Sequence, residues 1–289
     1  MARIFITGGT GYLGSVLVRQ ASAAGYQVAA SYHHRLPPPG AASWIPLDVC
    51  DAQAVTAALD QLRPALVIHT AYQQSGPAVL PVTGEGAGVV ARAAARIGAR
   101  LIHLSSDVIF DGEREDAYTE DDPPAPVSPY GAAKALAEHL VAAAHPDAVI
   151  VRTSLIYGFD PIDRISQFAL DVAAGRNAER LYTDEYRCPI YVDDLAAALL
   201  ELGSLTYRGV LHVAGAERLS RYEFGTLIAR AWGLDPAGIR GALSAESPVP
   251  RPRNCALAIT RAQGLLRTPL RGVRDVLRDL GRMRATHNA

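Results

Sequence analysis

The sequence predicts an α/β fold with a doubly wound parallel sheet, covered by helices on both faces. Short apolar runs that fit strands alternate along the first half of the chain with longer segments of helical periodicity. This alternation is typical of parallel strands joined by crossover helices. Later in the chain the pattern is interrupted, which indicates a second, smaller domain built from discontinuous C-terminal segments.

The elements are expected in a regular order from the N-terminus. Residues 3–7 fit a short buried strand, which runs into a glycine-rich turn and then a helix over 15–24 that Gly25 ends. The later elements follow the same alternation: strand 27–31, helix 52–62, strand 65–69, helix 86–97, strand 100–104, a helix through 135–144, and strands at 148–152 and 210–214.

Composition excludes several classes of protein. The 289 residues carry a net charge of −1, which argues against a nucleic-acid partner or a polybasic membrane surface. No run of about 18 apolar residues is present, so we expect no membrane-spanning helix, and the first strand begins too early for a signal peptide. Three widely spaced cysteines fit neither a disulfide frame nor a zinc site. We expect a cytoplasmic enzyme without a metal.

One basic residue is unlike the others. Of the 28 basic residues, 27 are arginine and only Lys134 is lysine. Because the two side chains differ in shape, hydration and pKa, a single lysine in such a chain marks a place where chemistry could require an ammonium group. The alternative is chance.

The first turn carries a dinucleotide-binding pattern. Gly8, Gly11 and Gly14 follow a strand and open a helix at the start of the chain, which is the context that this pattern requires. Glycines there let backbone N–H groups approach a pyrophosphate at the positive end of the helix. The sequence therefore predicts a Rossmann-type sheet, with a nucleotide-binding domain over 1–155 and 186–214 and a substrate domain over 156–185 and 215–289.

The end of the second strand favours NADP(H) over NAD(H). A carboxylate usually stands there to hold the ribose 2′-hydroxyl of NAD, but this chain has Ser31, His33, His34 and Arg35. A hydroxyl, two imidazoles and a guanidinium suit a 2′-phosphate instead. Which of them makes the contact stays open, NAD(H) remains an alternative cofactor, and a solvated loop is the competing interpretation.

A tyrosine and the single lysine are spaced for proton transfer. Tyr130 and Lys134 are four residues apart in a helical segment, so they share a face. The ammonium is expected to lower the pKa of Tyr130, so that the phenol can pass a proton to a carbonyl oxygen. Ser106, at the end of an earlier strand, offers a hydroxyl to orient that carbonyl, and Ser105 competes for this role.

Together these motifs resemble the extended short-chain dehydrogenase/reductases, and most closely the dTDP-4-dehydrorhamnose reductase family. The resemblance implies Ser106, Tyr130 and Lys134 as the catalytic set. It also implies that Asp48 meets the adenine and that Ala71 and Tyr72 line the cofactor. The matching stretches cover nearly the whole chain: Thr7–Gly14, Ser105–Gly112, Ser128–Glu138, Val151–Gly158, Pro189–Ala196 and His212–Gly225.

The full set of expected contacts follows from the motifs and the resemblance. Substrate contacts are expected from Asp107, Leu155 and Arg187. Contacts to the cofactor are expected from Gly8, Gly11, Tyr12, Leu13, Gly14, Ser31, His33, His34, Arg35, Asp48, Ala71, Tyr72, Tyr130 and Lys134.

Three positions depart from the family pattern. Ser106 replaces the usual threonine, Thr83 stands where extended members often have asparagine, and Leu155 replaces an aromatic residue at one wall of the sugar pocket. The change at Leu155 bears on which sugar the pocket accepts, more than on which type of reaction is catalysed. Five further histidines are expected to be hydrogen-bonded core or surface residues: His69, His103, His139, His145 and His212.

The leading hypothesis is an NADPH-dependent reductase of a nucleotide-linked 4-keto (deoxy)sugar. Hydride is expected to reach the carbonyl carbon from the nicotinamide while Tyr130 protonates the oxygen. A sugar-nucleotide epimerase or dehydratase on the same fold is an alternative, and so is a non-catalytic NADP-binding regulatory subunit. The expected partner is the small-molecule nucleotide sugar, with no nucleic acid and no membrane, and a homodimer is allowed for.

Overall fold

The computed structural model describes residues 2–40 and 42–287 of the chain. The chain divides into two compact units. The first comprises Met1–Ile109, Pro124–Arg152 and Ala196–Leu211, and the second Phe110–Pro123, Thr153–Leu195 and His212–Ala289. Four segments that were predicted to belong to the nucleotide-binding domain fall in the second unit: residues 110–123, 153–155, 186–195 and 212–214.

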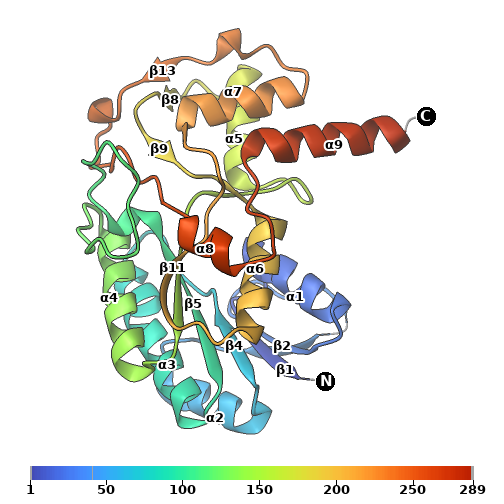
Figure 1. The fold of residues 1–289 in the computed structure, drawn as a ribbon, viewed down its shortest axis with the longest axis vertical. Helices are drawn as coiled ribbons and strands as arrows, with labels where there is room; N and C mark the ends of the chain where they lie inside the picture. Colours follow the sequence, from blue (N-terminus) through green and yellow to red (C-terminus); the bar gives the residue numbers. More distant parts are fainter. Residues whose placement is uncertain (1, 41, 288–289) are drawn as a thin grey trace. The chain divides into compact units, whose positions relative to one another are not determined.

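A seven-stranded sheet forms the centre of the first unit (Figure 1). Its order is β11-β6-β5-β4-β1-β2-β3, and the pairings from β5 across to β3 are parallel. The predicted doubly wound parallel α/β fold is therefore confirmed. The strands are β1 (Arg3–Thr7), β2 (Gln27–Tyr32), β3 (Ser43–Pro46), β4 (Leu66–His69), β5 (Arg100–Ser106), β6 (Val149–Thr153) and β11 (Gly209–His212).

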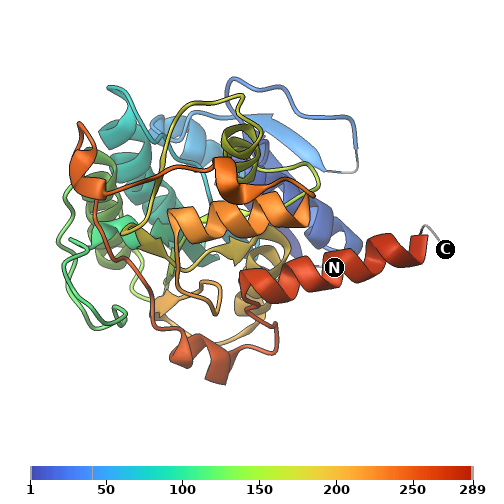
Figure 2. The same cartoon turned by 90° about the horizontal axis from the view of Figure 1, so that it is seen from above.

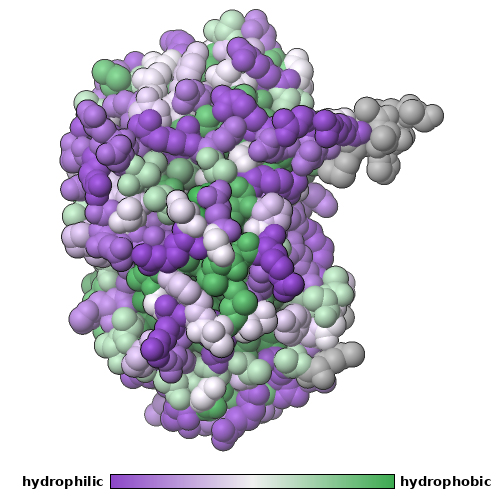
Figure 3. Space-filling model, in the orientation of Figure 1, coloured by the Kyte–Doolittle hydropathy of each residue, from purple (hydrophilic) through white to green (hydrophobic). Residues whose placement is uncertain are grey.

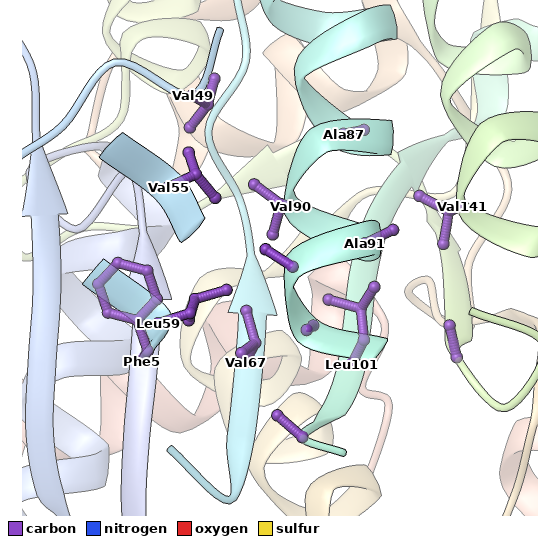
Figure 4. Close-up of a cluster of buried hydrophobic side chains, with 14 of the residues drawn as sticks. Phe5, Val49, Val55, Leu59, Val67, Ala87, Val90, Ala91, Leu101 and Val141 are labelled. Atoms are coloured by element: carbon purple, nitrogen blue, oxygen red, sulfur yellow. The ribbon is translucent and has the colours of Figure 1, made fainter. Parts of the chain in front are cut away.

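Helices cover both faces of this sheet. On one face, Phe5, Val67 and Leu101 of the sheet pack against Leu59 and Val90 of the helices (Figure 4). The helices of this unit are α1 (Tyr12–Ala23), α2 (Ala52–Leu62), α3 (Gly86–Arg96), α4 (Pro129–Ala144) and most of α6 (Val192–Ser204). In Figure 1, α1 and α6 lie on the opposite side of the sheet from α2, α3 and α4.

The second unit contains short strand pairs and helices. β7 (Ile156–Tyr157) pairs with β10 (Ile190–Tyr191), β9 (Tyr186–Arg187) with β12 (Leu219–Ser220), and β8 (Leu181–Tyr182) with β13 (Gly241–Ala242). Helix α7 (Arg221–Ala231) contacts both α5 (Arg164–Ala173) and α9 (Val273–His287) (Figure 2), and α8 spans Thr260–Leu265.

An aromatic cluster forms the core of the second unit. Tyr157 and Phe224 are fully buried, and Val273 and Val276 of α9 pack against the same cluster. The opposite face of α9 carries exposed arginines and is hydrophilic in Figure 3. In the part of the chain that the structure describes, no helix combines the length and apolar character needed to cross a membrane.

Candidate active site

The glycine turn between β1 and α1 has no room for side chains. Gly8 has φ +67°, and a Cβ added at Gly14 would lie 2.2 Å from the carbonyl oxygen of Gly8. The N–H of Gly11 donates to that same oxygen at 2.9 Å and closes the turn. The glycine positions of this turn therefore carry no Cβ where one would clash, which lets the backbone at the N-terminus of α1 come close to a pyrophosphate. Of the neighbouring expected contacts, Tyr12 is half-buried and Leu13 is buried.

The side chains at the end of β2 have separate roles. Ser31 is buried, and its hydroxyl accepts a hydrogen bond from the N–H of Gly8 at 3.2 Å. His33, His34 and Arg35 are exposed, and the two imidazole rings lie 3.8 Å apart. Ser31 thus supports the glycine turn, while the three exposed basic residues are the groups available to a 2′-phosphate.

The other expected cofactor residues are placed along the same edge of the sheet. Ala71 follows β4, and its Cα would lie 2.9 Å from a Cβ added at Gly8, so Ala71 forms a wall of the turn. Asp48 is exposed, and its carboxylate accepts a hydrogen bond from the N–H of Cys50 at 2.9 Å. Their contacts with a cofactor stay predictions.

Tyr130 and Lys134 lie on the first two turns of α4. Ser128 caps this helix, because its hydroxyl accepts from the N–H of Gly131 at 3.1 Å. The Nζ of Lys134 donates to the carbonyl oxygen of Leu104 at 2.7 Å and lies 5.9 Å from the ring centroid of Tyr130. It also lies 5.6 Å from the ring centroid of Tyr72, whose side chain is 52% exposed. The ammonium therefore faces two phenol rings, and the structure brings these three predicted residues together.

The two candidate serines differ in access. Ser105 is buried, and its hydroxyl has no hydrogen-bond partner among the described residues. Ser106 is half-buried at the end of β5 and donates to the carboxylate of Asp107 at 3.2 Å. Because a substrate can reach only a hydroxyl with some exposure, this difference favours Ser106.

Burial moves the pKa of both groups on α4. It raises the pKa of Tyr130 above its usual value, and Tyr72 and Asp107 add to the rise. The expected lowering of this pKa by Lys134 is therefore not found. Burial also lowers the pKa of Lys134 to about 8, against an opposing effect of the Glu138 carboxylate. Tyr130 is thus a protonated phenol at neutral pH, which is the form a proton donor needs.

The expected substrate residues lie in both units. Asp107 is buried at the start of a short 3₁₀ helix, Asp107–Ile109, in the first unit. Leu155 and Arg187 belong to the second unit, and Leu155 packs against its aromatic cluster. The guanidinium of Arg187 is buried and donates to the carbonyl oxygens of Tyr186 at 2.7 Å and Pro252 at 3.1 Å. These bonds give Arg187 a structural role, and its contact with substrate stays a prediction.

Several residues around the site were not singled out from the sequence for any role there. Glu138, one turn beyond Lys134, is buried and paired with Arg152 of β6 at 2.9 Å. Thr83, noted only as a departure, exchanges two 2.8 Å hydrogen bonds with the backbone of Gln73. His69 and His103 are buried, and the charge of Lys134 adds to the lowering of both pKa values by burial. Periodicity places such residues in the core but says nothing about which charged group they face.

The fold and the site together define a class of protein. A tight glycine turn opens a helix after the first parallel strand. Further along the chain, a tyrosine–lysine pair lies beside the carboxyl end of the parallel strand β5. This combination is that of an NAD(P)-dependent oxidoreductase of the short-chain type.

Comparison with known proteins gives the family. Residues 2–283 match the family described as RmlD substrate binding domain, and the chain belongs to it. The predicted family and the predicted enzyme class are confirmed.

Curated relatives match over most of their length. The chain is 35% identical to the dTDP-4-dehydrorhamnose reductase of Mycobacterium tuberculosis, over 95% of this chain and 91% of the relative. It is 33% identical to the "probable low-salt glycan biosynthesis reductase Agl14" of Haloferax volcanii, over 91% of each chain. It is 32% identical to a probable dTDP-4,6-dihydroxy-2-methyloxan-3-one 4-ketoreductase of Streptomyces antibioticus, over 96% of this chain and 94% of the relative.

Solved structures share the fold. A hypothetical dTDP-4-dehydrorhamnose reductase from Sulfolobus tokodaii has a TM-score of 0.82 at 28% identity, covering 94% of this chain and 97% of its own. The dTDP-4-dehydrorhamnose reductase of Bacillus anthracis, solved in complex with NADP, has a TM-score of 0.84 at 23% identity. It covers 96% of this chain and 98% of its own.

Proposed function

We propose that this protein is an NADPH-dependent reductase that converts the 4-keto group of a nucleotide-linked (deoxy)sugar to an alcohol. The observation that carries the proposal is the placement of Tyr130 and Lys134 together in the unit that holds the glycine turn. The names of the relatives support the substrate class, since two of the three compared act on dTDP-linked keto sugars.

Each residue of the site has a defined task in this reaction. Bound NADPH would supply the hydride that adds to the carbonyl carbon. Tyr130 gives its phenolic proton to the carbonyl oxygen, and Ser106 donates a hydrogen bond to the same oxygen. Lys134 stabilises the phenolate that forms and holds the ribose of the cofactor. The backbone of the glycine turn binds the pyrophosphate.

NADPH is the expected cofactor because no carboxylate occupies the end of β2. Exposed His33, His34 and Arg35 supply the positive charge and donors that a 2′-phosphate needs. A charged hydrogen bond of this kind contributes about 1.5–3 kcal/mol, which is roughly tenfold to a hundredfold in affinity. The structure neighbour solved with NADP is consistent with this preference.

The alternatives make different predictions. An epimerase or dehydratase would hold NAD tightly and show no net oxidation of NADPH, whereas a regulatory subunit would bind NADP without turnover. The tyrosine, lysine and serine that catalysis requires are all present, which favours the reductase. We further propose that the protein acts in the cytoplasm on its small-molecule substrate, and a homodimer would be tested by sedimentation.

The test is NADPH oxidation with a panel of nucleotide-linked 4-keto sugars, compared with NADH under the same conditions. Turnover with at least one dTDP-linked 4-keto sugar and at least tenfold lower activity with NADH are expected. Binding of NADPH without oxidation by any member of the panel would contradict the proposal. Equal or tighter binding of NADH would contradict the cofactor assignment alone.

A further inference from the structure

The loop after β4 carries Tyr72 to the side of the tyrosine–lysine pair. The centroid of the Tyr72 ring lies 6.0 Å from that of Tyr130 and 5.6 Å from Nζ of Lys134. Yet residues 72–78 are all exposed, and residues 70–78 form no helix or strand. Bonds other than core packing or a backbone ladder must therefore hold Tyr72 in this place.

Thr7 fixes the start of this loop. Its hydroxyl oxygen accepts from the N–H groups of Thr70 at 3.1 Å and Ala71 at 3.3 Å. Because both acceptor positions of that oxygen are then used, its own proton goes to Nδ1 of His69 at 2.7 Å. The hydroxyl of Thr70 donates in turn to the carbonyl oxygen of Thr7 at 2.7 Å. The end of β4 is thus bonded to the end of β1, directly beside the glycine turn.

Thr83 holds the loop on the other side of Tyr72. The side chain of Thr83 is 1% exposed, and its hydroxyl bonds both backbone groups of Gln73. It accepts from the N–H of Gln73 at 2.8 Å and donates to the carbonyl oxygen of the same residue at 2.8 Å. The two groups that Gln73 would use in a backbone ladder are therefore bonded to one hydroxyl. Since Gln73 follows Tyr72 in the chain, these bonds fix the backbone on the C-terminal side of Tyr72.

Thr83 is itself tied to α4. It lies in the π-helix η1 (Val79–Glu85), which packs against α4. The next residue, Gly84, allows a close approach, because a Cβ added there would lie 3.3 Å from the carbonyl oxygen of Ala133. Ala133 directly precedes Lys134 in the chain. The position of Thr83 is therefore set relative to the helix that carries the tyrosine–lysine pair.

We propose that Thr83 is a positioning residue, which through Gln73 holds Tyr72 beside the tyrosine–lysine pair, where Tyr72 contacts NADPH. This proposal rests on the reductase function argued above. Without these bonds the exposed loop would be free to carry Tyr72 away, and ordering it again on binding would cost conformational entropy. A hydroxyl suits the role because its oxygen can accept and donate at once. A valine of the same shape can do neither.

The first test is the affinity for NADPH, measured by fluorescence titration without a sugar substrate. Thr83→Val leaves both backbone groups of Gln73 unbonded and should weaken binding by about fivefold or more. Thr83→Ser keeps the hydroxyl and should retain most of the wild-type affinity. If Thr83 acts through Tyr72, Thr83→Val should cause no further loss in a Tyr72→Ala background. Additive losses, or wild-type affinity in folded Thr83→Val, would overturn the proposal.

Thr153→Val is the matched control for a purely structural effect. Thr153 is also a buried threonine, and its hydroxyl donates to the carbonyl oxygen of Val213 at 2.7 Å in the second unit. Its replacement removes a comparable bond away from the loop, so it should lower thermal stability without changing NADPH affinity. A loss of affinity equal to that of Thr83→Val would show that general destabilisation explains the effect, and the proposal would be wrong.

The second test needs neither cofactor nor substrate. Hydrogen exchange followed by NMR should show a protected Gln73 amide in the wild type, although Gln73 is exposed. Thr83→Val should speed exchange of this amide by about tenfold or more, and Thr83→Ser should not. An unprotected Gln73 amide in the wild type would overturn the proposal, even if Thr83→Val failed to fold. If the wild type binds NADPH but oxidises it with no keto sugar, the proposed function fails, whereas the exchange and affinity data still decide the role of Thr83.

Discussion

Lys134 is a buried ammonium at a position where we expect an arginine side chain not to fit. It is 4% exposed, its Nζ bonds Leu104, and aromatic rings lie within 6 Å of it. A guanidinium is planar, larger and spreads its charge over three nitrogens. The rest of the chain uses arginine at every basic position, and the single lysine stands at a buried position where the two side chains are not interchangeable.

We therefore expect Lys134→Arg to inactivate the enzyme, although the charge is kept. NADPH binding should weaken together with turnover, because the ammonium is proposed both to stabilise the Tyr130 phenolate and to hold the cofactor ribose. Fluorescence titration with NADPH and a steady-state assay would measure the two effects. Near-normal activity of this variant would mean that the lone lysine is an accident of composition.

The proposed role of Tyr130 in proton transfer can be separated by experiment from cofactor binding. Tyr130→Phe keeps the ring beside Tyr72 and Lys134 but removes the transferable proton, so the rate of reduction should fall by roughly 10²–10⁴-fold. NADPH affinity should change little. Single-turnover kinetics and the same titration would show this, and Tyr72→Phe serves as the matched control. A loss of the same size in Tyr72→Phe would move the proton donor away from Tyr130.

At the residue scale the sequence predicted which candidate groups lie together better than it predicted their electrostatics. Tyr130 and Lys134 follow from a four-residue spacing, which a helix turns into a shared face. The choice between Ser105 and Ser106 needed exposure, because adjacent strand residues point to opposite faces. The pKa of Tyr130 was expected in the wrong direction, since desolvation depends on neighbours that spacing does not reveal.

At the scale of elements, the β1–α1 turn is the segment with the least tolerance for change. A Cβ at Gly14 would lie 2.2 Å from the carbonyl oxygen of Gly8. The backbone would have to move to relieve this clash. We expect Gly14→Ala to destabilise the protein by about 1–3 kcal/mol and to weaken NADPH binding at least tenfold. Urea unfolding and NADPH titration would measure both effects.

Gly40 provides the control for this substitution. An added Cβ at Gly40 has open space, and its φ lies outside the left-handed region. Gly40→Ala should leave stability and NADPH binding unchanged within error. If Gly14→Ala behaved like Gly40→Ala, the glycine turn would be able to relax around the added Cβ, and its predicted intolerance of side chains would be wrong.

Elements with strong periodicity or a clear stop signal were predicted nearly to the residue, whereas short or irregular ones were not. β1 and α2 match their predicted bounds, because apolar runs and glycine or Asp caps mark their ends. Strand β3 has two exposed ends and two half-buried central residues, so it shows no alternation of buried and exposed side chains. The π-helix over Val79–Glu85 was also missed, because its hydrogen-bond spacing has no sequence signature of its own.

At the scale of the whole molecule, the parallel sheet was predictable and the division into units was less so. Alternating strand and helix patterns specify a doubly wound sheet directly. Residues 110–123 join the second unit through pairings such as Tyr118 with Leu257, which are distant in sequence. Contacts between residues so distant in sequence leave no local pattern. The bond from Arg187 to the carbonyl oxygen of Pro252 is another contact of this kind.

The buried imidazoles make the stability of the whole fold depend on pH. His69 and His103 have pKa values far below 6.5 when folded, whereas an unfolded histidine takes up a proton near pH 6.5. As pH falls below 6.5, the unfolded chain binds two protons that the folded chain does not, so the free energy of unfolding decreases. The loss amounts to about 1.4 kcal/mol per pH unit for each ring. At pH 5 it should reach on the order of 2 kcal/mol per ring relative to pH 7.

A variant with both rings replaced tests this linkage. In His69→Asn/His103→Gln the amides cannot titrate, and the Asn oxygen can still accept the hydrogen bond from Thr7. The variant should be less stable than the wild type at pH 7, yet lose about 4 kcal/mol less on going to pH 5. Urea unfolding at both pH values measures the difference, in which shared contributions from carboxylates cancel. An equal loss in both proteins would show that the two histidines are protonated in the folded state, because only then would their replacement leave the pH dependence unchanged.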